Sequence, residues 1–72
     1  MQTEKISLQP NQDYIKLDNA LKMAGIFPTG GQAKLEIQSG NVTVNGEVCT
    51  QRGKKLHIGD KAEYNGTVVE VC

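Results

Sequence analysis

The sequence has no excess of charge of either sign. Eight Lys and Arg side chains balance eight Asp and Glu side chains, so the formal net charge at pH 7 is zero. A strongly basic protein attracts polyanions over its whole surface, and a neutral one does not. Any interaction with nucleic acid must therefore depend on how the charges are distributed.

Aromatic residues, cysteines and long apolar runs are also scarce. With two Tyr, one Phe and no Trp, base stacking cannot dominate an interface. Cys49 and Cys72 form no CxxC motif, so we expect two reduced thiols, one a small strand residue and the other at a frayed terminus. No apolar run approaches the roughly 20 residues of a membrane span, and the polar start does not resemble a signal peptide. We expect a soluble, cytoplasmic protein.

Motifs for catalysis are missing as well. The sequence has no Ser-His-Asp set, no paired carboxylates around an evident pocket and no Cys beside a recognisable base. Its glycines occur at helix ends and turns rather than in a phosphate-binding loop. His57 with the two cysteines is too small a set for a metal site. We expect no enzymatic activity, no metal and no cofactor.

The first half of the chain reads as a strand followed by a helix. A length of 72 residues suits one domain over residues 1–72, which would bury about 60% of the surface of its unfolded chain. Apolar and polar residues alternate over residues 4–9, which predicts a short strand. Apolar residues at i, i+3, i+4 and i+7 then predict a helix that begins at Leu17 and stops at Gly25; they are Leu17, Ala20, Leu21 and Ala24.

A second helix follows an apolar connector at residues 26–28. Thr29 and Gln32 have the spacing of a capping box, in which side chains satisfy free backbone amides at a helix start. Ala33 and Ile37 form its apolar edge, and Gly40 provides a stop. The two helices should pair through this short connection.

After the second helix the apolar period changes to two. Asn45-Gly46 and Asn65-Gly66 each join two alternating segments, which predicts two β-hairpins with two-residue turns. In the first hairpin this places Val44 opposite Glu47. The core-facing residues would be Val42, Val44, Cys49, Ala62, Tyr64, Val69 and Val71. The fold class is α+β, with two short helices packed on a small, mainly antiparallel sheet.

Basic residues gather between the hairpins. Four bases lie between Glu47 and Asp60 with no acid among them; they are Arg52, Lys54, Lys55 and His57. Such a cluster produces a local positive field that suits phosphate contacts. The alternative is an ordinary solvated face.

Four segments occur in an order that resembles one known family. They are KLDNALK at 16–22, TGGQAK at 29–34, IQSGNVTVNGEV at 37–48 and RGKKLHIGD at 52–60. Together they resemble the RNA-binding domain named after small-subunit ribosomal protein four, here the S-four-type domain, and in particular its small free-standing bacterial versions. Each motif is weak alone, but their order and short spacing are specific. The similarity runs from about residue 6 to the C-terminus.

The resemblance implies the family's αL-like motif and a surface that binds structured RNA, notably ribosomal or transfer RNA. The matching positions are Lys16, Thr29, Gly30, Gly31, Gln32, Lys34, Asn45, Arg52, Lys54 and Lys55. Many members have Arg at the position of Lys16 and a Ser-Arg pair in place of Thr29-Gly30. Lysine lacks the planar fork of arginine, so binding is expected to be weaker or less specific there. Exposed amides at the second helix's start can still hold a phosphate.

Several of these positions also have structural interpretations. The glycines at 30 and 31 allow close approach of the helices, Asn45 suits the turn, and Lys34 can be a solvated helix residue. For the chain as a whole, the alternative is a protein-interaction module in ribosome assembly or translation without direct RNA contact. We expect RNA as the main partner, ribosomal or assembly proteins as further partners, no membrane, and a monomer.

Overall fold

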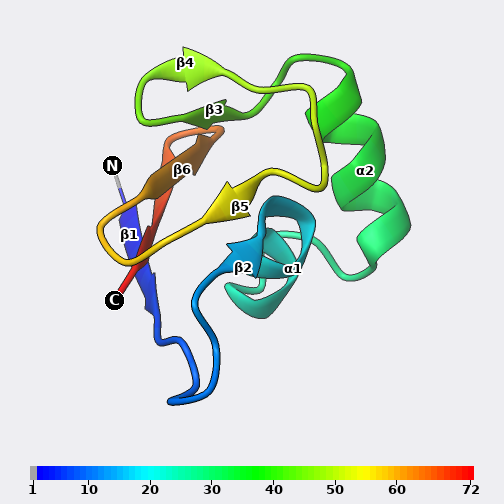
Figure 1. The fold of residues 1–72 in the computed structure, drawn as a ribbon. Coiled ribbons are helices and arrows are strands. Elements are labelled where there is room, and N and C mark those ends of the chain that lie inside the picture. The colour runs from blue at the N-terminus through cyan, green and yellow to red at the C-terminus, as the bar shows by residue number, and fades with distance from the viewer. Residues whose placement is uncertain (1) are drawn as a thin grey trace.

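The computed structural model describes residues 2–72, in which seven strands and two helices form an α+β fold (Figure 1). The helices are α1 (Leu17–Met23) and α2 (Gly30–Gln38). The strands are β1 (Gln2–Ile6), β2 (Ile15–Lys16), β3 (Thr43–Val44), β4 (Glu47–Val48), β5 (Lys55–Leu56), β6 (Lys61–Tyr64) and β7 (Thr67–Val71). Five strands make a mixed, mostly antiparallel sheet in the order β1-β7-β6-β3-β4, and β2 pairs with β5 apart from it. The predicted fold class is confirmed.

Both helices end at the glycines that the sequence predicts. Gly25 has φ 78°, and the Ile26 N–H donates to the Leu21 carbonyl at 3.1 Å, which satisfies a carbonyl of the last turn. Gly40 repeats this arrangement at the end of α2 with φ 82°. Neither helix of residues 2–72 is long and apolar enough to cross a membrane.

The core lies between the helices and one face of the five-stranded sheet, and Figure 1 shows both helices on the same side of that sheet. The predicted apolar stripes of α1 and α2 point into it. The largest fully buried side chains are Leu17, Leu21, Ile37, Val42, Leu56, Val69 and Val71. Nothing polar or charged is buried among residues 2–72, so polar chemistry is confined to the surface.

The two hairpins form as predicted. Asn45 and Asn65 have φ 52° and 50°, and the glycine after each also has a positive φ, as the preferred two-residue turn requires. Val44 lies opposite Glu47, which confirms the predicted register. The core-facing residues of both hairpins are buried or half-buried.

The position of the first strand was predicted wrongly. The strand covers Gln2–Ile6 instead of residues 4–9, because it pairs in parallel with β7, and Ile6 lies opposite Val71. Local alternation cannot report a partner so distant in sequence. The expectation of a frayed Cys72 was also wrong, since its N–H donates to the Ile6 carbonyl at 2.8 Å and its carbonyl accepts from the Leu8 N–H at 3.3 Å.

Candidate functional site

Two dipeptides that are distant in the sequence pair as β2 and β5. Ile15 lies opposite Leu56, and Lys16 lies opposite Lys55. Because Ile15 and Leu56 are buried, the two lysines, one residue away on each strand, are exposed on the other face. The sequence predicted neither strand: Lys55 was expected in a loop between the two hairpins, and this was wrong, because Lys55 lies in β5 and pairs with Lys16 in β2.

The segment of residues 52–55, called the basic loop below, is also fastened to the start of α1. The Leu17 N–H donates to the Lys54 carbonyl at 2.9 Å, and the Asp18 N–H donates to the Arg52 carbonyl at 3.2 Å. These bonds satisfy amides of the first helical turn, where no side chain caps the helix. The result is one group of four exposed cations, the basic cluster, which consists of Lys16, Arg52, Lys54 and Lys55.

The basic cluster has no neutralising ion pair. In the part of the chain that the structure describes, the one contact within 4.0 Å between a basic nitrogen and a carboxylate oxygen joins His57 Nδ1 and Asp60 Oδ2 at 3.8 Å. No carboxylate therefore meets the four exposed cations at that distance. A protein of zero net charge thus presents a local positive field.

Asn45 is held in place by hydrogen bonds between the hairpin turn and β6. Its Nδ2 donates to Asp60 Oδ1 at 3.2 Å, and its Oδ1 accepts from the Lys61 N–H at 3.0 Å. The other Asp60 oxygen accepts from the His57 N–H at 2.8 Å. Donors to the ionised carboxylate, first His57 and then Asn45, hold the pKa of Asp60 below its ordinary value. These bonds support the structural interpretation of Asn45.

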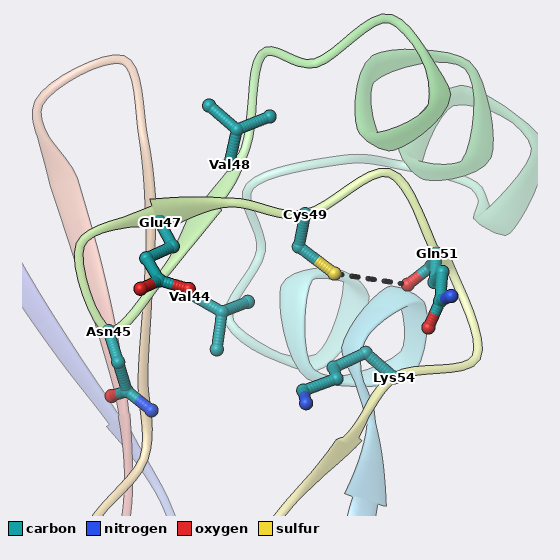
Figure 2. A pocket seen from close by; sticks show the side chains of 7 residues that line it. All are labelled: Val44, Asn45, Glu47, Val48, Cys49, Gln51 and Lys54. Carbon is teal, nitrogen blue, oxygen red and sulfur yellow. Dashed lines mark hydrogen bonds between the residues drawn. The ribbon is translucent and has the colours of Figure 1, made fainter.

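A shallow hollow of about 340 Å³ lies between the first hairpin and the basic cluster (Figure 2). Asn45 and Glu47 lie on its hairpin side, and Lys54 lies on the opposite side in Figure 2. Cys49 Sγ contacts the Gln51 carbonyl oxygen at 3.6 Å within it. Cys49 is a free thiol, and no group of His, Cys, Asp or Glu in residues 2–72 is arranged to hold a metal ion.

The start of α2 is open to solvent. Thr29 Oγ1 accepts from the Gln32 N–H at 3.3 Å, which confirms Thr29 as the N-cap. The second bond of the predicted capping box, between the Gln32 side chain and the Thr29 N–H, does not form within residues 2–72. A Cβ built at Gly30 would meet no atom within 4 Å, and one at Gly31 would meet only Thr29 Oγ1 at 4.0 Å. Close helix packing therefore does not explain these glycines. Lys34 is half-buried rather than fully solvated.

The structure joins some of the predicted site residues and leaves others apart. Lys16 and the basic loop come together, and Asn45 shares a hollow with Lys54. Among residues 2–72 no hydrogen bond or ion pair connects the start of α2 to the basic cluster, although Figures 1 and 2 both show the loop after β4 passing beside α2. Contact of any of these residues with RNA stays a prediction.

Sequence reasoning missed Tyr14. This exposed ring has the Lys55 Nζ 4.9 Å from its centroid and the His57 ring 6.2 Å away at an angle of 53°. It precedes Lys16 by two residues. A single tyrosine in a polar segment forms no periodic pattern that would predict a site. The available signal was its position two residues before Lys16 in a sequence with few aromatic residues.

Comparison with known proteins decides the family. The S4 domain model matches residues 8–72. The chain belongs to the S4 domain family. Among S4 relatives, the probable ribosome maturation protein RlbA of Bacillus subtilis is 39% identical over 54 residues, which cover 75% of this chain and 76% of that protein. The putative RNA-binding protein YbcJ of Escherichia coli is 34% identical over 58 residues, covering 81% and 83% of the two chains.

A solved structure agrees with this family assignment. The solution structure of Escherichia coli YbcJ superposes with a TM-score of 0.72 at 32% sequence identity. The match covers 94% of this chain and 85% of YbcJ, and that structure is described as revealing an ALFAL motif involved in RNA-binding. This S4 domain chain therefore shares both its family and its fold with YbcJ.

Proposed function

We propose that this chain binds folded RNA, ribosomal or transfer RNA, and that it acts in ribosome maturation or translation as a binding protein without catalysis. The opposed pair Lys16 and Lys55 carries the proposal. Like charges directly opposite each other weaken a strand pair, and a phosphate placed against them would offset that repulsion. The names of RlbA and YbcJ, which refer to ribosome maturation and RNA binding, support it.

The surface proposed for RNA consists of the basic cluster and the start of α2. The cluster's four cations meet phosphates, whose positions in folded RNA are read as shape rather than as sequence. At the start of α2, the amides of Gly30 and Gly31 make no hydrogen bond within residues 2–72 and are open to a further phosphate. Lysine predominates in the cluster, so its contacts act as point charges.

Binding of this kind depends strongly on salt. If about three to five phosphates are neutralised, the logarithm of the binding constant should fall against the logarithm of salt concentration with a slope of about −2 to −5. A slope near zero would contradict phosphate contacts as the source of affinity.

An NMR titration tests the proposal. The ¹⁵N-labelled protein is titrated at low salt with a folded fragment of small-subunit ribosomal RNA, and separately with a single-stranded RNA of the same composition. We expect shifts at Lys16, residues 30–34 and residues 52–55, larger with the folded fragment. Shifts confined to other surfaces would overturn the proposed surface, and no shifts with either RNA would overturn the function.

Protein docking in ribosome assembly is the second candidate. It is favoured by two exposed apolar side chains, Leu35 on α2 and Val48 on the edge strand β4, which are 64% and 63% exposed. Single apolar residues are common on protein surfaces, so this observation weighs less than the basic cluster. Absence of RNA-induced shifts at low salt would favour docking.

A further inference from the structure

A second hollow lies next to the basic cluster and has a different chemical character. Its volume is about 360 Å³, and it is open to solvent. The lining combines one aromatic ring, three side-chain amides, one carboxylate and one ammonium group; its residues are Asn11, Gln12, Asp13, Tyr14, Ile15, Lys16 and Asn19. Lys16 belongs to both this hollow and the basic cluster, so the two sites are continuous.

The Tyr14 ring is supported from outside the hollow. Lys55 places its Nζ 4.9 Å from the ring centroid, and the tilted His57 ring lies 6.2 Å away. Neither Lys55 nor His57 lines the hollow, whereas Tyr14 does. The next residue, Ile15, is buried and paired in β2, which fixes the backbone beside the ring.

Two of the amides in the hollow are free to bind. Gln12 Oε1 accepts a hydrogen bond from the Gln9 N–H at 3.0 Å. The side chains of Asn11 and Asn19 make no hydrogen bond within residues 2–72, and both are exposed. An amide side chain offers a donor and an acceptor together, which matches the edge of a nucleobase.

We propose that this hollow holds one unpaired nucleobase of the bound RNA. The base stacks on Tyr14, its edge meets Asn11 and Asn19, and the phosphate beside it meets Lys16. A paired base in an A-form helix is already stacked, and its edge is hard to reach, so only a base from a bulge, loop or end can enter. The inference rests on the proposed RNA binding and names one subsite of it.

The test uses one RNA hairpin in two forms. In the first, 2-aminopurine is a single-nucleotide bulge, and in the second the same 2-aminopurine is paired with uracil. Anisotropy of a terminal dye reports binding, and 2-aminopurine fluorescence reports stacking. The variants are Tyr14→Phe, which keeps the ring, Tyr14→Leu, which removes it, and Tyr64→Phe as a control at a tyrosine whose ring lies against Phe27 at a tilt of 59°.

We expect the unchanged protein, Tyr14→Phe and Tyr64→Phe to quench the bulged 2-aminopurine. Tyr14→Leu should lose this quenching and bind the bulged hairpin about tenfold more weakly, since stacking of one base commonly contributes that much. Its binding to the paired hairpin should change by less than about twofold, because the phosphate contacts remain. A thermal melt of each variant shows that the fold is kept.

Two results would overturn the inference, and they differ. If the unchanged protein and Tyr14→Leu quench equally, or bind the bulged hairpin with equal affinity, the proposed base subsite is contradicted. The proposal that the protein binds RNA is not. No change of anisotropy with either hairpin at low salt would remove the proposed function together with the subsite.

Discussion

Lys16 and Lys55 lie directly opposite each other where β2 pairs with β5, and both side chains are exposed. Two like charges in this position oppose the pairing that the buried Ile15 and Leu56 favour. The arrangement therefore makes the strand pair less stable than an oppositely charged pair would. It also places two exposed lysines on neighbouring strands, and Lys55 Nζ lies 4.9 Å from the centroid of the Tyr14 ring.

The change Lys16→Glu should separate stability from binding. It replaces a repulsive pair by an attractive one, so the free energy of unfolding should rise by about 0.2–1 kcal/mol, while RNA affinity falls. Urea unfolding and RNA-binding anisotropy measure the two effects. Lys5→Glu is the matched control, because Lys5 lies opposite Glu70 and the same change creates a like-charged pair. That control should lower stability, and a loss of stability in Lys16→Glu would contradict the argument.

Neutralising the basic loop should weaken RNA binding and its salt dependence together. The variant changes three cations to Gln; they are Arg52, Lys54 and Lys55. Loss of about three phosphate contacts should make the log-log salt slope shallower by about 2–3. Binding isotherms at several salt concentrations give the slope.

The control for this variant removes the same charge elsewhere. It changes three exposed lysines outside the basic cluster to Gln; they are Lys5, Lys22 and Lys61. Its salt slope should stay close to that of the unchanged protein. Equal slopes in both triple variants would show that net charge, and not the basic cluster, determines binding.

The glycines at the start of α2 offer a test of backbone contact. Alanine at Gly30 or Gly31 has free space and a compatible backbone, so the free energy of unfolding should stay the same or rise by up to about 1 kcal/mol. RNA affinity should fall, because a Cβ keeps a phosphate from the amides. Gly40→Ala serves as the contrast, since φ 82° at that position makes alanine destabilising. Unchanged affinity would remove the start of α2 from the proposed surface.

The sequence predicted those parts of the fold that are determined locally. Thr29 as N-cap, the glycine stops and the Asn-Gly turns each depend on a few adjacent residues, and all are confirmed. The pairing of β2 with β5 could not be predicted, because two-residue strands have no alternation to detect and their partner is 39 or more residues distant. The parallel position of β1 was missed because its partner, β7, is 65 residues distant in the sequence.

The candidate site was predictable as a set of residues but not as a group in space. Arg52 and Lys54 stood out by charge, and Lys16 only by resemblance to a family. These residues come together because backbone carbonyls of the basic loop accept hydrogen bonds from amides of the first turn of α1. A sequence does not show which backbone carbonyls will do this. Tyr14 became visible only because the fold brings Lys55 over its ring.

The two Asn-Gly turns should respond differently to Asn→Gly. Glycine suits the backbone of both turns. Asn45→Gly also removes the hydrogen bonds to Asp60 and Lys61, so the free energy of unfolding should fall by about 1–2 kcal/mol. Asn65 makes no side-chain hydrogen bond within residues 2–72, and Asn65→Gly should change stability by less than about 0.5 kcal/mol. Denaturant unfolding compares them, and equal losses would contradict the role given to Asn45.

Asp60 should contribute stability that disappears in acid. The His57 N–H and the Asn45 amide favour its ionised form, so the pKa of Asp60 in the folded protein lies below its ordinary value. The contribution is fully present above the ordinary pKa of about 3.9 and is lost as the pH falls through the lower folded value. Asp60→Asn should thus be destabilising near pH 6, and less so as the pH falls below about 4.

Unfolding curves across this pH range check the prediction for Asp60. Asp13→Asn is the control, because Asp13 is exposed and makes no hydrogen bond within residues 2–72. A difference between the unchanged protein and Asp60→Asn that does not vary with pH would contradict the assignment.

The parallel pairing of β1 with β7 determines when the sheet can form during synthesis. β1 has no other partner in the sheet, and β7 lies between it and β6. On the ribosome, residues 2–6 must therefore remain unpaired until residues 67–71 have emerged, while the helices and the first hairpin can form from local contacts. The apolar side chain of Ile6 stays in water for that interval, and β1 is the last strand that can join the sheet.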